Sequence, residues 1–339
     1  MTNILFFDVD DITRAYLKDH PIAGVQYVLH DFDINHPSVK TLGKELETSI
    51  ISVFPHSDMV KNSVLDLFGN LKLIATRSTG FNHIDLNYAA QRQIAVENVP
   101  NYGEITVAEF TMGTMIGLAR KIYKAKSEMK ANNVHMNDYI GIDLSGRTLG
   151  VIGTGAIGRH VIRLATAFGM RILAYDPFPN AALKKDGISY VDLPTLYKQA
   201  DIITLHCPAT PENFHLLDQQ AFAQMKKGVL IVNTARGSLI ETEALYNALK
   251  SGQVGGAALD VLENEDVITH REIATDMDTR DHDFLIDSVI NFKMMQLDTT
   301  IITPHVAFNS IDAVHRILQT TLDNIQAFLN GAVQNNVIK

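Results

Sequence analysis

LGVIGTGAIG, residues 149–158, is the most informative segment of this chain. An apolar run typical of a buried strand leads directly into a G-x-G-x-x-G pattern. Gly153 permits a tight turn, and Gly155 removes a side chain that would keep a phosphate away from the backbone. Gly158 lets the next helix pack close to the strand, and the N-terminus of that helix offers free N–H groups to phosphates. The pattern therefore predicts a strand-turn-helix unit that binds a dinucleotide.

The residues after this motif supply the context that a bare glycine pattern lacks. A second apolar run, residues 170–175, ends in Asp176, which lies 176 − 158 = 18 residues after the last glycine. This spacing is close to the ~20 residues expected for the acid that binds the ribose hydroxyls. The alternative is a structural glycine turn followed by a surface aspartate. Because no Arg or Lys adjoins Asp176 and a carboxylate repels a 2′-phosphate, the predicted cofactor is NAD rather than NADP.

The composition indicates a globular protein with room for two domains. The 339 residues are 46% hydrophobic, and 29 Lys and Arg stand against 38 Asp and Glu, a net charge of −9. That balance argues against nucleic acid and anionic membranes as partners. The single cysteine, Cys207, excludes an intramolecular disulfide and a Cys-rich metal site, so no metal is expected. The first residues lack a basic leader and no apolar run is long enough to span a bilayer, so we expect a cytoplasmic protein.

The late position of the glycine motif predicts how the chain is organised. As many as 148 residues precede Leu149, so a separate domain must occupy the N-terminal region. Strand and helix patterns alternate on both sides of the motif, which predicts parallel sheets flanked by helices. We therefore expect an α/β fold with two Rossmann-like domains and a cleft between them. The expected limits are 1–101 plus 307–339 for a discontinuous substrate (catalytic) domain and 102–306 for the dinucleotide-binding domain.

Two further segments have distinctive patterns. Residues 104–130 predict one long helix with apolar residues on several faces. A subunit interface would explain this pattern, and a core helix between domains is the alternative. Residues 263–298 are charged and irregular, and their pattern assigns no element.

The chemistry is expected at one edge of the predicted sheet, because ligands bind at the carboxyl ends of parallel strands. Arg236 follows the apolar run 229–233, His305 follows 300–303, and an acid follows 257–261. Arg can hold a carboxylate with two hydrogen bonds, and His exchanges a proton near neutral pH. A carboxylate beside the imidazole would orient it and raise its pKa. Glu263 and Glu265 compete for that role, and the pattern alone does not choose between them.

Six further segments, in order along nearly the whole chain, resemble one enzyme family. They are residues 77–85 (RSTGFNHID), 98–102 (NVPNY), 201–208, 232–237, 258–265 and 303–308. Together with the glycine motif, they resemble the D-isomer-specific 2-hydroxyacid dehydrogenases, and most closely the lactate branch of that family. The resemblance implies NAD as cofactor, a homodimer formed through the 104–130 region, and a small 2-oxo or 2-hydroxy acid as substrate.

The resemblance also implies roles for individual residues. Arg236 is expected to bind the substrate carboxylate, Glu265 to pair with the catalytic imidazole, and His305 to act as general acid and base. The backbone N–H groups of Thr79 and Gly80 are expected to share the carboxylate. The side-chain pocket of the substrate is expected to be walled by Phe54, Tyr102 and Phe308. The expected cofactor contacts are Gly153, Gly155, Ala156, Ile157, Gly158, Asp176, Cys207, Pro208, Asn213, Thr234 and Asp260.

The expected reaction is the reversible reduction of pyruvate to D-lactate with NADH, in a cleft that closes over the substrate and excludes water. Within enzymes, the alternative is another 2-oxo acid, such as 2-ketoisocaproate, hydroxypyruvate or glyoxylate. Outside enzymes, the alternative is an NAD(H)-sensing corepressor-like binding protein, which shares this fold and similar residues.

Overall fold

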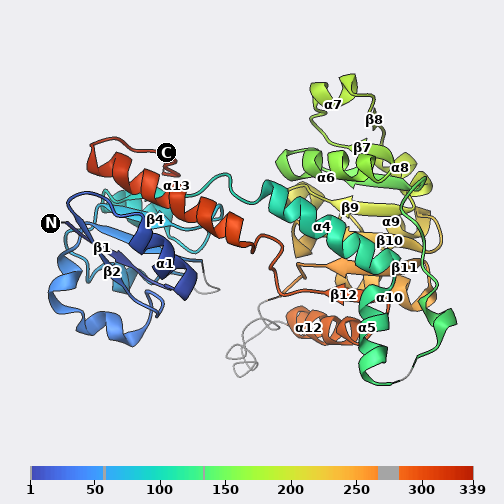
Figure 1. Cartoon of the computed structure of the whole chain (residues 1–339), viewed down its shortest axis with the longest axis horizontal. Coiled ribbons are helices and arrows are strands. Elements are labelled where there is room, and N and C mark those ends of the chain that lie inside the picture. Colours follow the sequence, from blue (N-terminus) through green and yellow to red (C-terminus); the bar gives the residue numbers. More distant parts are fainter. Residues whose placement is uncertain (1, 56–58, 133, 266–281, 339) are drawn as a thin grey trace. The chain divides into compact units, whose positions relative to one another are not determined.

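The computed structural model describes residues 2–55, 59–132, 134–265 and 282–338 (Figure 1). The chain divides into two compact units. The first unit consists of Met1–Tyr102 and Asn309–Lys339, and the second is Gly103–Phe308. The fold class is confirmed, because each unit is built on a parallel sheet flanked by helices.

The first unit contains a five-stranded parallel sheet in the order β2-β1-β3-β4-β5. Its strands are β1 (Thr2–Phe6), β2 (Val25–Leu29), β3 (Ile50–Val53), β4 (Leu73–Thr76) and β5 (Ala95–Glu97). Helices α1 (Asp11–Asp19) and α13 (Ile311–Leu329) pack on one face through Leu17, Leu322 and Ile325. Helices α2 (Asn62–Leu65) and α3 (Leu86–Gln91) pack on the other face. Two short 3-10 helices, η1 (Pro37–Thr41) and η2 (Gly43–Glu47), lie between β2 and β3.

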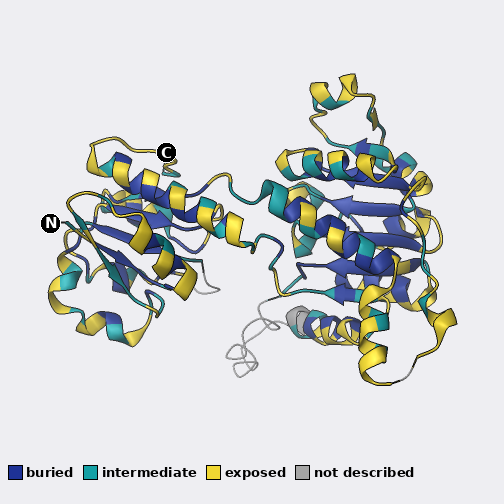
Figure 2. Ribbon diagram, viewed as in Figure 1, coloured by how far each residue is buried: buried dark blue, intermediate teal, exposed yellow. Residues whose placement is uncertain are grey.

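The second unit contains a seven-stranded parallel sheet in the order β12-β11-β10-β9-β6-β7-β8. Its strands are β6 (Thr148–Ile152), β7 (Arg171–Tyr175), β8 (Ser189–Tyr190), β9 (Ile202–Leu205), β10 (Val229–Asn233), β11 (Val254–Leu259) and β12 (Thr300–Ile302). Strands β6, β9 and β10 are buried along their whole length, which Figure 2 shows as dark blue arrows. Both faces of a parallel sheet are covered by helices, so such strands read as continuous apolar runs.

Helices cover both faces of this second sheet. Helices α4 (Glu104–Ala119) and α6 (Ala156–Ala167) share one apolar cluster with the strands. The other face carries α8 (Leu193–Gln199), α9 (Gln219–Gln224), α10 (Thr242–Ser251) and α12 (His282–Met295). The short α7 (Ala181–Lys185) precedes β8. Within the described ranges, no helix combines the length and the apolarity that crossing a bilayer requires.

The prediction of a single long helix over residues 104–130 is wrong. The structure has two helices there, α4 and α5 (Ile122–Lys130), separated by Arg120 and Lys121. Lys121 has a φ of +52°, the left-handed conformation that ends a helix. The ring of Tyr123 packs so close to Gly117 that a Cβ there would lie 2.6 Å from it, so the start of α5 contacts α4. The segment 263–298, left unassigned by its pattern, contains α12, and its residues 266–281 lie outside the described ranges.

Candidate active site

The glycine loop between β6 and α6 has the shape that a pyrophosphate needs. A Cβ on Gly153 would lie 2.5 Å from the backbone nitrogen of Cys207, and a Cβ on Gly158 would lie 2.1 Å from the carbonyl oxygen of Gly153. Gly153 also has a φ of +93°, which side chains rarely adopt. Gly155 faces open space and no side chain caps α6, whose first turn contains Ala156 and Ile157. These residues fit a dinucleotide, because a phosphate can take the place of the missing cap.

The other expected cofactor residues follow neighbouring strands of the same sheet. Asp176 follows β7, Cys207 and Pro208 follow β9, and Thr234 follows β10. Strands β6 and β9 are neighbours where the strand order reverses, which is where Rossmann sheets bind their ligand. Asn213 donates to the carbonyl oxygen of Pro208 at 2.8 Å and so fixes the loop after β9.

Cys207 lies in this loop as a neutral thiol. Burial raises its pKa to about 11, so the thiolate is scarce at neutral pH. The sulfur can therefore contact a cofactor but is poorly suited to act as a nucleophile.

The structure brings Glu265 and His305 together at the ends of β11 and β12. The His305 Nδ1 and Glu265 Oε1 atoms are 2.8 Å apart. Because Nδ1 faces the carboxylate, Nε2 is the ring atom left to exchange a proton with a ligand. The side chain of His305 is 44% exposed and that of Glu265 is 28% exposed, so the pair is accessible to a small molecule.

The electrostatic surroundings of His305 favour the imidazolium. The hydrogen bond that His305 donates to Glu265 raises the pKa of His305, and burial of the imidazole opposes this shift. The charges of Glu265 and Asp260 raise this pKa further, whereas the positive charge of Arg236 lowers it. Arg236 therefore lies within electrostatic reach of the imidazole. Its guanidinium donates to the carbonyl oxygen of Ala235 at 2.6 Å, and its side chain is exposed.

Asp260 has a structural role that the sequence did not reveal. It is 2% exposed, and its carboxylate accepts hydrogen bonds from the Thr303 hydroxyl (2.6 Å) and the backbone N–H groups of Val306 (3.0 Å) and Ala307 (2.8 Å). These bonds hold the turn that carries His305, whose φ is +53°. Such backbone conformations cost ~1–3 kcal/mol and persist where the surroundings over-determine them. A buried carboxylate ringed by donors from one turn provides that support.

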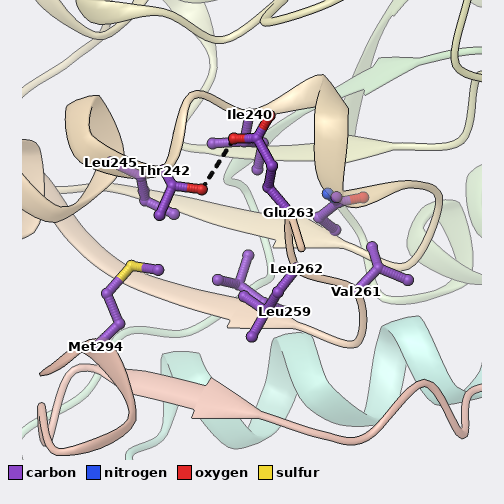
Figure 3. A pocket seen from close by; sticks show the side chains of 10 residues that line it. Ile240, Thr242, Leu245, Leu259, Val261, Leu262, Glu263 and Met294 are labelled. Carbon is purple, nitrogen blue, oxygen red and sulfur yellow. Dashed lines mark hydrogen bonds between the residues drawn. The ribbon is translucent and has the colours of Figure 1, made fainter. Parts of the chain in front are cut away.

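Glu263, the competitor of Glu265, is used elsewhere. Its Oε1 atom lies 2.8 Å from Nε2 of His215, and its Oε2 atom accepts from the Thr242 hydroxyl at 3.1 Å. Figure 3 shows Glu263 reaching Thr242 across a cavity whose other labelled side chains are apolar. Neither Arg236, Glu265 nor His305 lines this cavity. Asn264, between the two glutamates, has a φ of +55°, and the side chains on either side of it reach different histidines.

The expected substrate contacts are divided between the two units. In the first unit, the Thr79 hydroxyl donates to the carbonyl oxygen of Val99 at 2.7 Å, and Gly80 follows it in the same loop. Phe54 lies under the guanidinium of buried Arg77, and the Tyr102 carbonyl oxygen accepts from Arg316. In the second unit, the Phe308 ring packs edge-on against the His305 ring at 6.5 Å. Among the described residues, no group of three or more His, Cys, Asp or Glu could hold a metal ion.

Comparisons with known proteins agree on one family. The family model "D-isomer specific 2-hydroxyacid dehydrogenase, NAD binding domain" matches residues 112–307. D-lactate dehydrogenase of Escherichia coli is 38% identical, with 94% of each chain covered. An aromatic 2-oxoacid reductase of Clostridium sporogenes is 41% identical, with 78% of each chain covered. The crystal structure of D-lactate dehydrogenase from Aquifex aeolicus, complexed with NAD and lactic acid, has a TM-score of 0.79 at 32% identity and 99% coverage of both chains.

Proposed function

The chain belongs to the D-isomer-specific 2-hydroxyacid dehydrogenases, and we propose that it reduces pyruvate to D-lactate. It is an NAD-dependent oxidoreductase that acts on the CH–OH group of D-2-hydroxy acids, as the family does. The choice of pyruvate is supported by a D-lactate dehydrogenase among its relatives. It is also supported by the aromatic residues Phe54, Tyr102 and Phe308, which are expected to leave room for only a small side chain.

The observation that carries the proposed chemistry is the pair formed by Glu265 and His305. Their 2.8 Å contact and the raised pKa of His305 provide a proton donor whose charged form is favoured by its surroundings. Arg236 follows β10, two strands from β12 in the same sheet, and it supplies a permanent positive charge near this donor.

Each residue of the site then has one task in the reduction. Arg236 binds the substrate carboxylate through its guanidinium and orients the ketone. Nε2 of His305 donates a proton to the ketone oxygen as it becomes a hydroxyl. Glu265 stabilises the imidazolium through Nδ1 and keeps the ring in one orientation. NADH, when bound, supplies the hydride that reduces the carbonyl carbon. In the reverse direction, Nε2 accepts the proton of the alcohol.

A panel of 2-oxo acids with NADH tests the proposed substrate. We expect pyruvate to give the highest kcat/KM, with 2-ketoisocaproate, phenylpyruvate, hydroxypyruvate and glyoxylate below it. Chiral analysis of the product should find D-lactate. A higher kcat/KM for any other member of the panel would show that pyruvate is the wrong substrate while leaving the reaction class intact.

A bulky 2-oxo acid is the second candidate. The relative from Clostridium sporogenes is an aromatic 2-oxoacid reductase at 41% identity. Membership in the family therefore does not determine which substrate side chain the pocket accepts. Phenylpyruvate in the panel distinguishes this candidate from pyruvate, because three aromatic walls that suit a methyl group should exclude a phenyl ring.

We also propose that the chain forms a homodimer through the 104–130 region and works in the cytoplasm. Apolar side chains are exposed on and just after α5, among them Tyr123 at 50%, Met129 at 68% and Met136 at 79%. Exposed apolar patches of this kind often mark protein interfaces. Light scattering should give the mass of two chains, and Met129→Lys should shift the population toward the monomer. A monomeric parent would contradict the proposal.

A further inference from the structure

A chain of hydrogen bonds in the second unit ends on the carboxylate of Asp176. The backbone N–H of Asn180 donates to the Tyr190 hydroxyl at 3.0 Å, and this hydroxyl donates to Oγ1 of Thr154 at 2.9 Å. The Thr154 hydroxyl in turn donates to Oδ2 of Asp176 at 2.8 Å. A hydroxyl has one hydrogen to give, so every bond in the chain points toward the carboxylate.

The same contacts distinguish the two oxygens of Asp176. Oδ2 also accepts from the backbone N–H of Thr154 at 2.7 Å, so two donors fill it. Oδ1 accepts from the backbone N–H of Phe178 at 2.8 Å, its one donor among the residues that the structure describes. Since a carboxylate oxygen can accept two hydrogen bonds, Oδ1 retains a site for a ligand hydroxyl.

A cation stands close to this chain of hydrogen bonds. Lys184 does not adjoin Asp176 in the sequence, but its Nζ atom lies 5.6 Å from the centre of the Tyr190 ring, which belongs to this chain of hydrogen bonds. Lys184 is exposed, whereas Thr154 is only 3% exposed. If the Asp176 carboxylate could rotate away from the ribose, the ammonium group of Lys184 could pair with the 2′-phosphate of NADP.

We propose that Thr154 and Tyr190 are positioning residues that set the preference for NAD over NADP by locking Asp176. Thr154 fixes Oδ2 and leaves Oδ1 facing the ribose, and Tyr190 orients the Thr154 hydroxyl so that its hydrogen points at the carboxylate. This inference rests on the proposed role of Asp176 as the ribose ligand.

The test compares the binding of NADH and NADPH without substrate, by quenching or enhancement of their fluorescence. Tyr190→Phe removes one hydroxyl and keeps the ring under Lys184. Loss of one neutral hydrogen bond should lower the NADH-to-NADPH affinity ratio about fivefold. Thr154→Val removes a donor to a charged oxygen and should lower the ratio tenfold or more, on the order of a charge-assisted bond. Thr154→Ser retains the hydroxyl and should restore a ratio close to that of the parent.

Two reference variants keep the interpretation specific. Tyr197→Phe removes a hydroxyl that donates to the carbonyl oxygen of Leu216, so it should leave the affinity ratio unchanged even if it lowers the melting temperature. Asp176→Ala reports whether the carboxylate itself discriminates between the dinucleotides. If Thr154→Val does not fold, Tyr190→Phe still provides the measurement.

The inference is overturned if Tyr190→Phe and Thr154→Val keep the NADH-to-NADPH affinity ratio of the parent while Asp176→Ala lowers it. The carboxylate would then discriminate between the dinucleotides without being held by Thr154 and Tyr190. If Asp176→Ala also keeps the parent ratio, the proposed ribose role of Asp176 fails, and the inference falls with it. Both outcomes can be told apart from a wrong substrate, because pyruvate is absent from the assay.

Discussion

Replacing Glu265 with Gln should shift the pH range in which the enzyme reduces its substrate. The change preserves the shape of the side chain and removes its charge. In the parent, the hydrogen bond that His305 donates to Glu265 is the largest cause of the raised pKa of His305, and burial and Arg236 act against it. Glu265→Gln should therefore lower the pKa of His305, because a neutral amide stabilises the imidazolium less than a carboxylate does.

The contact at 2.8 Å sets the size of the effect. A hydrogen bond to a charged group contributes ~1.5–3 kcal/mol. The two side chains are 44% and 28% exposed, so solvent screening reduces this to about 1 kcal/mol. An energy of that size changes the protonated population about fivefold where the imidazole is mostly neutral.

The sign of the pH dependence follows from the direction of the pKa shift. Reduction requires protonated His305, so kcat/KM is high below the pKa of His305 and falls as pH rises through it. Since the Gln variant has the lower pKa, its activity should fall at a lower pH. The kcat/KM values of the parent and the Gln variant should differ about fivefold above the pKa of His305 and should converge below it.

Profiles of kcat/KM for pyruvate reduction against pH, from about pH 5 to about pH 9, measure this shift. Glu243→Gln is the matched control, because Glu243 is exposed in the first turn of α10. NADH binding should be unchanged in both variants. An alkaline limb of Glu265→Gln that coincides with that of the parent would refute the electrostatic role of the pair.

Three further predictions test the substrate anchor, a buried acid and the glycine loop. Arg236→Lys should raise the KM for pyruvate ~10–100-fold, because an ammonium group cannot make the two parallel hydrogen bonds of a guanidinium. NADH affinity should stay unchanged. An unaltered KM would show that Arg236 does not bind the substrate carboxylate. Glu97 is fully buried, and burial raises its pKa to about 7. The free energy of unfolding therefore falls by up to roughly 3 kcal/mol as pH rises from about 5 to 8. Urea unfolding of Glu97→Gln should not show this fall. Gly153→Ala should weaken NADH binding and lower the free energy of unfolding by roughly 2–4 kcal/mol, whereas Gly187→Ala, with a φ of +84° but open space around it, should retain NADH affinity.

The elements that could be predicted from sequence are those whose pattern is local. The runs around 149–152 and 229–233 form fully buried strands β6 and β10, because parallel strands covered on both faces are apolar throughout. The break between α4 and α5 could not be predicted in this way. It occurs at Lys121, whose left-handed φ of +52° leaves the apolar pattern of 104–130 unchanged.

The choice between two glutamates illustrates the same limit within the site. Glu263 and Glu265 stand two residues apart in a loop, so no periodicity assigns them to different partners. Their directions are set by tertiary contacts, including the close approach of Gly237, where a Cβ would lie 2.1 Å from the backbone of Leu262. Family resemblance selected Glu265, and the structure brings Glu265 to His305 for a geometric reason that no single-sequence pattern contains.

The two histidine–glutamate pairs divide one loop into an anchored part and an accessible part. Glu263 is 13% exposed and is held by His215 and Thr242, and its carbonyl oxygen accepts from Asn291 of α12. Glu265 is 28% exposed and contacts an imidazole that is 44% exposed. Because the anchored glutamate fixes the backbone two residues away, the second carboxylate can stay near solvent without losing its position. A proton donor that must meet a substrate needs this combination of fixed position and access.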